Sequence, residues 1–327
     1  MLHSPDTKFA IAAVREACAL IRDVQRSLVT QALTKSDRSP VTVADFAAQA
    51  IIAQRFASER ADDVLVGEED AGDLRSEASR ATLDNVTRFV GERVPGTTSD
   101  TVCTWIDRGR AEPTARFWTL DPVDGTKGFL RGEQYAVALA LIEDGRVRVG
   151  VLGCPNLTAD GRSDIGGRGY VVAAERGAGT WACALGSDDW HRLRVSARGV
   201  PAEARLLRSV ESGHTNVDEM GELVQALGGT AEPVLMDSQA KYAVLAAGCG
   251  ELLFRLLSAA KPDYRERIWD QAAGSIVVEE AGGKVTDLDG KTLDFSRGRT
   301  LATNRGVVAS NGVLHEAALT ALARVGA

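Results

Sequence analysis

Residues 121–132, with the sequence DPVDGTKGFLRG, constrain the fold of this chain more than any other segment. The apolar stretch at 117–120 predicts a strand that carries Asp121 and Asp124 to its end. Gly125 can adopt a positive φ, so the backbone can turn sharply there and present N–H groups to an anion. Magnesium binds one or two carboxylates together with phosphate oxygens. The segment therefore indicates metal-assisted phosphoryl hydrolysis.

The same residues have a simpler explanation, because Asp-Pro and Asp-Gly pairs often do no more than form a turn. A second alternative is the phosphatase pattern Asp-x-Asp-Gly-Thr, in which the first aspartate is a covalent nucleophile. In this chain the two aspartates are three residues apart rather than two, which argues against that chemistry. Other residues along the chain must decide between a turn and a metal site.

Length and charge limit the classes of protein to consider. A chain of 327 residues with 44% hydrophobic content exceeds the roughly 250–300 residues at which single cores stop growing. We therefore expect two domains, an α+β domain at 1–200 and an α/β domain at 201–327. A net charge of −7 disfavours a nucleic-acid polymer or an anionic membrane as partner. A small anionic substrate stays possible if metals and local basic residues supply positive charge.

The cysteines and the N-terminus indicate the compartment. The five cysteines are scattered without a C-x-x-C pair, so reduced thiols are expected rather than disulfides or a zinc cluster. Charged residues occupy the N-terminal region where a signal peptide would be apolar, and no apolar run reaches the ~20 residues of a membrane span. We expect a soluble, cytoplasmic monomer.

Hydrophobic periodicity predicts the elements of the first 200 residues. Helices are expected at 6–28 and 42–59, the second starting with a capping box of Thr42 and Asp45. The segment 71–116 is weakly patterned and predicts a helix near 78–93 and a strand near 102–106. Further strands are expected at 64–66, 135–142, 147–152, 169–174 and 180–184, of which 135–152 form a hairpin and most build an antiparallel sheet. The glycine-rich stretch 161–169 is interpreted as a plain loop.

After residue 200 strands and helices alternate, which predicts a mainly parallel or mixed α/β layer. Strands are expected at 206–210, 234–236, 251–256, 284–286 and 307–310. Helices are expected at 216–228, at 238–248, from about 270 to 281, and at 312–325.

Three further acidic sites stand at the ends of predicted elements. Glu68 and Glu69 end a strand, Asp270 precedes a helix, and Asp45 follows Thr42. Each alone has an ordinary explanation: a solvated acidic turn, an N-cap, and a capping box. Together with the aspartate pair they match what two-metal hydrolysis requires, namely several carboxylates from separate elements around two cations about 3.5–4 Å apart.

Taken together, these segments resemble the lithium-sensitive, magnesium-dependent phosphatase superfamily that includes inositol monophosphatase and fructose-1,6-bisphosphatase. Within it, the tail of the motif at 128–135 is similar to that of the 3′(2′),5′-bisphosphate nucleotidase branch. The residues that carry the resemblance lie at 35–45, 67–70, 118–135 and 264–270.

The resemblance implies a layered α-β-α-β-α fold, two or three Mg²⁺ ions, and lithium inhibition. It implies metal ligands from four carboxylates and one backbone carbonyl, and a pair that orients and deprotonates the attacking water. It further implies contacts to the substrate. The metal ligands are Glu68, Asp121, the carbonyl of Val123, Asp124 and Asp270; the water pair is Asp45 and Thr126; the substrate contacts are Gly125, Thr126, His214, Ser238, Lys241 and Arg255.

The activity that the resemblance implies is removal of the 3′-phosphate of 3′-phosphoadenosine 5′-phosphate to give AMP, with the sulfated analogue as a second substrate. The alternative enzyme is an inositol phosphate phosphatase acting on inositol 1-phosphate or 1,4-bisphosphate. A nucleotide-binding sensor on a degenerate scaffold is disfavoured, because every position expected to hold metal or to activate water has a competent side chain.

Overall fold

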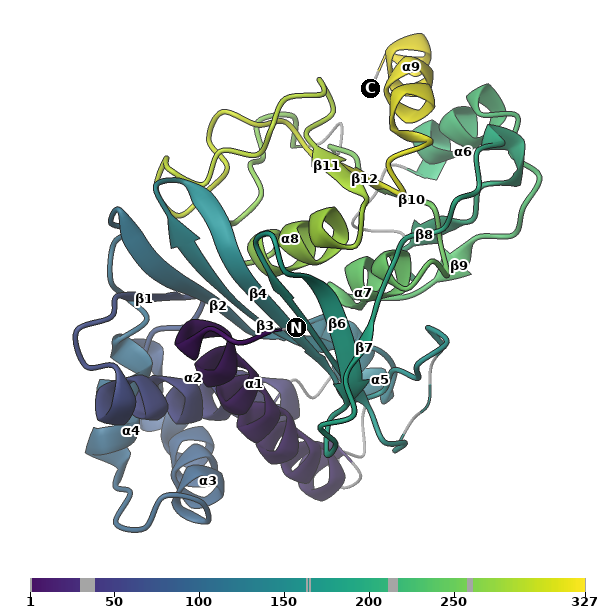
Figure 1. Cartoon of the computed structure of the whole chain (residues 1–327). Helices are drawn as coiled ribbons and strands as arrows, with labels where there is room; N and C mark the ends of the chain where they lie inside the picture. Colours follow the sequence, from purple (N-terminus) through teal and green to yellow (C-terminus); the bar gives the residue numbers. More distant parts are fainter. Residues whose placement is uncertain are drawn as a thin grey trace.

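Five alternating layers of helices and sheets make up the fold (Figure 1). The computed structural model describes residues 2–29, 39–162, 164, 166–210, 217–257 and 261–326. From bottom to top in Figure 1, the layers are α1 to α4, a seven-stranded sheet, α7 with α8, a five-stranded sheet, and α6 with α9. The mixed α/β fold and the layered order predicted from the sequence are confirmed.

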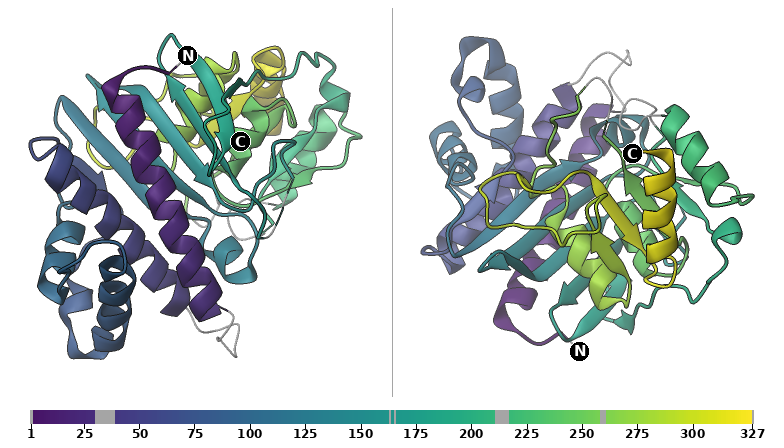
Figure 2. Two further views of the ribbon diagram at one scale, coloured as in Figure 1. Left: turned by 60° about the horizontal axis from the view of Figure 1, so that its bottom comes forward. Right: turned by 90° about the horizontal axis from the view of Figure 1, so that it is seen from above.

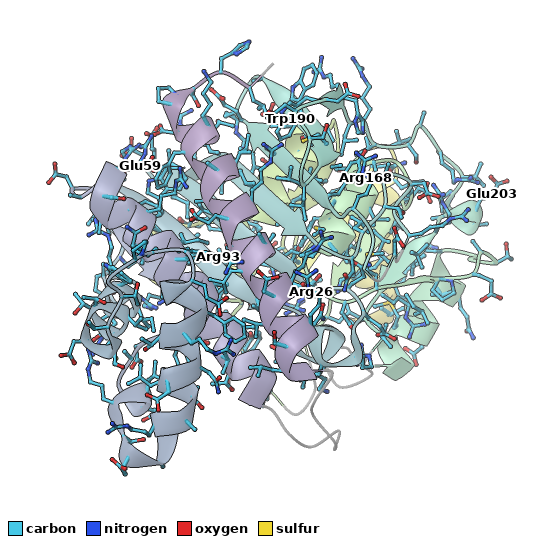
Figure 3. The ribbon with its side chains drawn as sticks, turned by 90° about the horizontal axis from the view of Figure 1, so that it is seen from below. Arg26, Glu59, Arg93, Arg168, Trp190 and Glu203 are labelled. Atoms are coloured by element: carbon cyan, nitrogen blue, oxygen red, sulfur yellow. The ribbon has the colours of Figure 1, made fainter. Side chains whose placement is uncertain are left out.

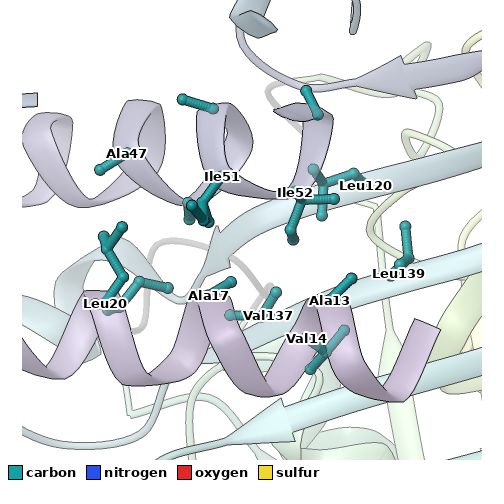
Figure 4. Packing of buried hydrophobic residues seen from close by; sticks show 14 of the residues in the cluster. Ala13, Val14, Ala17, Leu20, Ala47, Ile51, Ile52, Leu120, Val137 and Leu139 are labelled. Atoms are coloured by element: carbon teal, nitrogen blue, oxygen red, sulfur yellow. The ribbon is translucent and has the colours of Figure 1, made fainter. Parts of the chain in front are cut away.

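The first helical layer packs small residues against the large sheet. It contains α1 (Pro5–Val24), α2 (Ser39–Glu59), α3 (Arg80–Gly91) and α4 (Ser99–Asp107). Ser4 caps α1 by accepting the N–H of Thr7 at 3.1 Å. Ala13 and Ala17 are buried and let α1 approach the sheet closely (Figure 4). The left view of Figure 2 shows α1 lying across the sheet. Arg93, which follows α3 and is labelled in Figure 3, forms an ion pair with Asp23 of α1.

Two predictions for this layer are wrong. α2 begins at Ser39, three residues before Thr42, so Thr42 and Asp45 form no capping box at its start. Pro40 lies in the first turn, where a missing N–H costs no intrahelical hydrogen bond. The strand expected near 102–106 is instead helix α4, which Thr98 and Thr101 start with a reciprocal capping box.

The seven-stranded sheet has the order β1-β2-β3-β4-β5-β6-β7. All neighbours are antiparallel except β1 and β2, which run parallel. The predicted hairpin is confirmed as β3 and β4, joined through Asp144 and Gly145, both with positive φ. The sequence did not predict β7. The strands are β1 (Leu65–Gly67), β2 (Arg116–Asp124), β3 (Ala136–Glu143), β4 (Arg146–Cys154), β5 (Tyr170–Glu175), β6 (Gly179–Ala184) and β7 (His191–Arg192).

The five-stranded sheet has the order β11-β12-β10-β8-β9 and mixes parallel with antiparallel pairs, as predicted. Figure 2, right, shows α9 and α6 side by side on this sheet. The elements of this half are β8 (Leu206–Arg208), α6 (Val217–Ala226), β9 (Val234–Leu235), α7 (Ala240–Ala246), β10 (Leu252–Arg255), α8 (Ala272–Glu280), β11 (Lys284–Thr286), β12 (Val307–Ser310) and α9 (His315–Val325); α5 (Thr126–Arg131) belongs to the first half.

One hydrophobic cluster joins the two halves of the chain. Alternate residues of the large sheet face opposite sides, so Leu139 packs with α1 and α2 while Ala138 packs with α7 and α8. A side chain at Gly150 of β4 would meet Ala273 O at 2.8 Å, so α8 approaches the sheet very closely. The boundary near residue 200 stays a prediction, and it crosses a continuous core.

Candidate active site

A cavity of about 420 Å³ opens where β2 and α5 meet α7 and β10. It gathers predicted residues from both halves of the chain. Its lining includes Glu68, Asp121, Val123, Asp124, Gly125, Thr126, Ser238, Lys241, Arg255 and Asp270, all singled out from the sequence. It also includes Lys127, Gly128, Leu130, Ser209, Asp237, Gln239, Tyr242, Leu253, Tyr264 and Gln271.

The strand pair β1 and β2 brings Glu68 next to the aspartates. Gly67 lies opposite Leu120 in the parallel pairing, and the Glu68 N–H donates to Leu120 O at 3.2 Å. The pairing of β2 with β3 shifts register between Asp121 and Asp124, an irregularity of the kind that redirects side chains. Strand pairing therefore places three carboxylates at one end of the sheet.

The turn predicted at Gly125 is confirmed. Gly125 has φ +92°, and a side chain there would meet the Ser238 Cβ at 2.8 Å and Gln134 O at 3.1 Å. Both observations require glycine at this position. Asp124 is held from the other half of the chain, because the Gln239 N–H donates to its Oδ2 at 2.5 Å.

The carboxylates gathered at this end of the sheet repel one another. Burial, and then the neighbouring carboxylates led by Glu68, raise the pKa of Asp121 well above its ordinary value. Burial and then Asp124 likewise raise the pKa of Asp270. Asp121 is 3% exposed, and its Oδ1 has no hydrogen-bond partner among the described residues. Such a group of negative charges and free lone pairs is favourable only when a cation or protons neutralise it.

The donor set fits a hard cation by its chemistry. Carboxylate and carbonyl oxygens are the ligands that Mg²⁺ prefers, and Asp121 has an unused buried oxygen. In the described part of the chain, no three His, Cys, Asp or Glu side chains are already arranged to hold a metal ion. The individual metal-ligand assignments therefore stay predictions.

Asp45 is not among the residues that line the cavity. Burial, and then Glu69 and Glu68, raise the pKa of this carboxyl well above its ordinary value. Asp45 is thus close to the acidic group, and its pairing with Thr126 stays a prediction.

The sequence marked Glu69 together with Glu68 as an acidic site but assigned Glu69 no role. Burial, and then Glu68 and Asp70, raise its pKa to about 7. Gln49 of α2 holds its backbone, since the Glu69 N–H donates to Gln49 Oε1 at 3.0 Å and Gln49 Nε2 donates to Glu69 O at 2.6 Å. A solvated turn was the alternative explanation of the Glu-Glu-Asp sequence, and packing against α2 leaves Glu69 half-buried.

We expect the Glu69→Gln variant to be more stable than the wild type at pH 7.5 in the absence of metal. A carboxyl whose pKa is raised by folding binds a proton more tightly in the folded state. Its destabilising effect therefore develops as the pH rises from about 4.5 towards 7. The melting temperatures of the variant and the wild type, measured in excess chelator, should differ at pH 7.5 and converge near pH 4.5. Equal melting temperatures of the two proteins at both pH values would contradict a raised pKa of Glu69.

The cavity is also lined by two basic residues, Lys241 and Arg255, which we call its basic side. Lys241 Nζ lies 3.1 Å from Ser209 Oγ, and burial, then Arg255, lower the pKa of this amine to about 8. Arg255 pairs with Glu266 at 2.9 Å. Ser238, also predicted, has φ +66° at the entry to α7. His214 lies outside the described residues.

Several lining residues were missed although the sequence contained a signal. Asp237 and Gln239 flank the predicted Ser238, and Ser209 falls within the strand predicted at 206–210. Asp237 accepts hydrogen bonds from Arg131 and from the Val210 N–H, which joins α5 to the end of β8.

No helix in the described part of the chain is both long and apolar enough to cross a membrane. The fold is similar to that of the IMPase of Thermotoga maritima, with a TM-score of 0.63 over 99% of this chain and 98% of that one at 21% identity. That similarity supports the fold alone.

The sequence relatives are more informative. A 3′(2′),5′-bisphosphate nucleotidase of Emericella nidulans is 39% identical, covering 99% of both chains. A 3′(2′),5′-bisphosphate nucleotidase of Oryza sativa is 40% identical, over 95% of this chain and 91% of the relative. The model of the inositol monophosphatase family matches residues 2–327. The chain therefore belongs to the inositol monophosphatase family.

Proposed function

We propose that the chain is a 3′(2′),5′-bisphosphate nucleotidase that hydrolyses the 3′-phosphate of 3′-phosphoadenosine 5′-phosphate to give AMP and phosphate. The observation that carries this proposal is that one cavity is lined both by acidic residues, Asp121 and Asp270 among them, and by the basic residues Lys241 and Arg255. A substrate with two phosphates can place one at each side. The nucleotidase relatives named above support the same activity.

The acidic side would perform the hydrolysis. Glu68, Asp121, Asp124, Asp270 and the carbonyl of Val123 would hold the metal ions. Bound Mg²⁺ supplies Lewis acidity that neutralises phosphate charge and acidifies water. Asp45, whose pKa is raised by burial and by Glu69, is suited to accept a proton from the attacking water with Thr126 orienting it. The N–H groups of Gly125 and Thr126 would bind the scissile phosphate.

The basic side would select the nucleotide. Lys241 and Arg255 would bind the 5′-phosphate, with Ser238 and His214 as further contacts. The sulfated analogue carries the same two phosphate positions and is a plausible second substrate. We further expect a cytoplasmic monomer that is inhibited by lithium and serves sulfur assimilation.

A comparison of four substrates tests the proposal. Purified protein with Mg²⁺ is assayed for phosphate release from 3′-phosphoadenosine 5′-phosphate, its sulfated analogue, inositol 1-phosphate and inositol 1,4-bisphosphate, with and without Li⁺. We expect the adenosine bisphosphate to give the highest kcat/KM. If this nucleotide released no phosphate while inositol 1-phosphate was hydrolysed efficiently, the alternative enzyme, an inositol phosphate phosphatase, would be established instead.

We expect the Lys241→Met variant to lose affinity for the nucleotide substrate while retaining its turnover. A hydrogen bond to a charged group contributes about 1.5–3 kcal/mol, which corresponds to a rise in KM of about 10- to 150-fold. Because Lys241 lies on the basic side, kcat at saturating substrate should change much less than KM. Steady-state kinetics at pH 7 measure both. The exposed Lys291→Met variant is the control, and an unchanged KM for Lys241→Met would remove this residue from the substrate site.

A further inference from the structure

We propose that Arg299 is a positioning residue that fixes Glu68 relative to Asp270. This inference rests on the proposed function, because those two residues are predicted metal ligands. They come from distant parts of the chain, Glu68 after β1 and Asp270 before α8. Some structural element must keep them at a constant separation, since metal ions tolerate little variation in ligand geometry.

The guanidinium of Arg299 holds the end of β1. Its Nη2 donates to the carbonyl of Gly67, the residue directly before Glu68. Its Nη1 donates to Gly109 O at 3.3 Å and to Ala111 O at 3.1 Å. The Gly67 N–H in turn donates to Gly109 O at 2.8 Å. One side chain from the C-terminal half therefore fixes the backbone on which Glu68 is mounted.

The same guanidinium contacts the residue directly before Asp270. Its central carbon lies 5.1 Å from the ring centroid of Trp269, within the range of a cation–π interaction. Trp269 is 6% exposed, so its ring is fixed by packing. A second cation, Arg267, lies 5.6 Å from the same centroid. Arg299 thus contacts both residues that precede the two carboxylates.

The backbone around Arg299 adds a third connection. The Ile268 N–H donates to Arg299 O at 3.2 Å, and the Leu301 N–H donates to Glu266 O at 2.9 Å. Arg267 and Thr300 form an isolated antiparallel bridge between these hydrogen bonds. The segment that leads to Asp270 is therefore paired with the segment that carries the guanidinium.

Only arginine can make all these side-chain contacts at once. Its planar fork has several donors in fixed directions and stacks on aromatic rings, whereas the lysine ammonium is a compact point charge. Arg299 also lines a second cavity of about 490 Å³ together with Glu68, Trp269 and Asp270. Removing the fork should therefore loosen both carboxylates without touching the basic side of the active site.

The test is Mg²⁺ binding to the metal-free full-length protein, measured by isothermal titration calorimetry. The variants are Arg299→Met, Arg299→Lys and the control Arg297→Met, which removes an exposed arginine two residues away. Loss of groups that orient metal ligands typically weakens metal binding roughly 10–100-fold. We expect that range for Arg299→Met, a loss of about tenfold for Arg299→Lys, which keeps the charge, and a change within about twofold for Arg297→Met. The melting temperature of each metal-free variant is measured in parallel.

The outcomes separate this inference from the proposed function. If the wild type binds Mg²⁺ and the Arg299 variants bind it with the same affinity, the inference is overturned and the proposed function stands. A lower melting temperature with unchanged Mg²⁺ affinity would show a merely structural arginine and would also overturn it. If Arg299→Met does not fold, Arg299→Lys decides. Failure of the wild type to bind Mg²⁺ would refute the metal chemistry and the positioning role with it.

Discussion

Replacing Asp121 by asparagine is expected to abolish most of the activity and, at the same time, to stabilise the metal-free protein. A metal ion supplies several kcal/mol of transition-state stabilisation, and each 1.4 kcal/mol is a factor of about ten in rate. Loss of one central ligand should therefore lower kcat at least about a thousandfold. Stability should rise because the substitution removes a buried charge, one oxygen of which has no hydrogen-bond partner among the described residues.

Two measurements check this result. Phosphate release gives kcat, and thermal unfolding in excess chelator at pH 7.5 gives the stability. Asp84→Asn is the matched control: it makes the same chemical change on an exposed face of α3 and should alter stability by no more than about 0.5 kcal/mol. Full activity of the Asp121→Asn variant would remove this residue from the metal site. A lower melting temperature would show that the carboxylate has stabilising partners when folded.

The Gly128→Ala variant is expected to lose both stability and activity. A Cβ at this position would lie 2.0 Å from Gln134 O and 3.3 Å from the Asp237 Cβ. A backbone carbonyl cannot move aside as the end of a flexible side chain can, so α5 must shift. Overpacking typically costs 1–3 kcal/mol, and here we expect about 3 kcal/mol or more. Because α5 begins at Thr126, the shift should also disturb the phosphate-binding turn.

Urea unfolding and steady-state kinetics measure these effects. Gly221→Ala in α6 is the control, because a methyl group there meets nothing within 4 Å. Alanine in place of this helical glycine should stabilise the protein by roughly 0.5–1 kcal/mol and leave kcat unchanged. If Gly128→Ala unfolded at the same urea concentration as the wild type, the close contact between α5 and the loop before β3 would be wrong.

Local signals sufficed for the part of the site that is contiguous in sequence. The strand, turn and short helix around Asp121, Asp124 and Gly125 follow from residue types whose preferences act over a few positions. The presence of Lys241 and Arg255 in the same cavity as these aspartates could be predicted only from the family resemblance. Local sequence does not specify which distant segments of a chain come together.

Two features could not be predicted from local sequence, each for its own physical reason. In α4 the β-branched and aromatic residues Val102, Trp105 and Ile106 suggested a strand, whereas the capping pair before them favoured a helix. Propensity was outweighed by capping and by burial against α2. For Glu69, solvation depends on what covers the turn, and a helix some twenty residues earlier in the chain covers it. The parallel pairing of β1 with β2 likewise could not be predicted from local sequence, because it joins segments that are far apart along the chain.

The hydrogen bond from the Gln239 N–H to Asp124 has a consequence for folding. It connects a residue of the N-terminal half to a peptide group that reaches it only after α7 has packed on the large sheet. The acidic group is therefore complete only when both halves of the chain are packed together. A fragment ending at residue 200 would contain Glu68, Asp121 and Asp124 but neither Asp270 nor the backbone of Gln239 that holds Asp124. Metal affinity thus reports on completion of folding, and a titration with Mg²⁺ can serve as a sensitive assay of whether a variant has reached its native state.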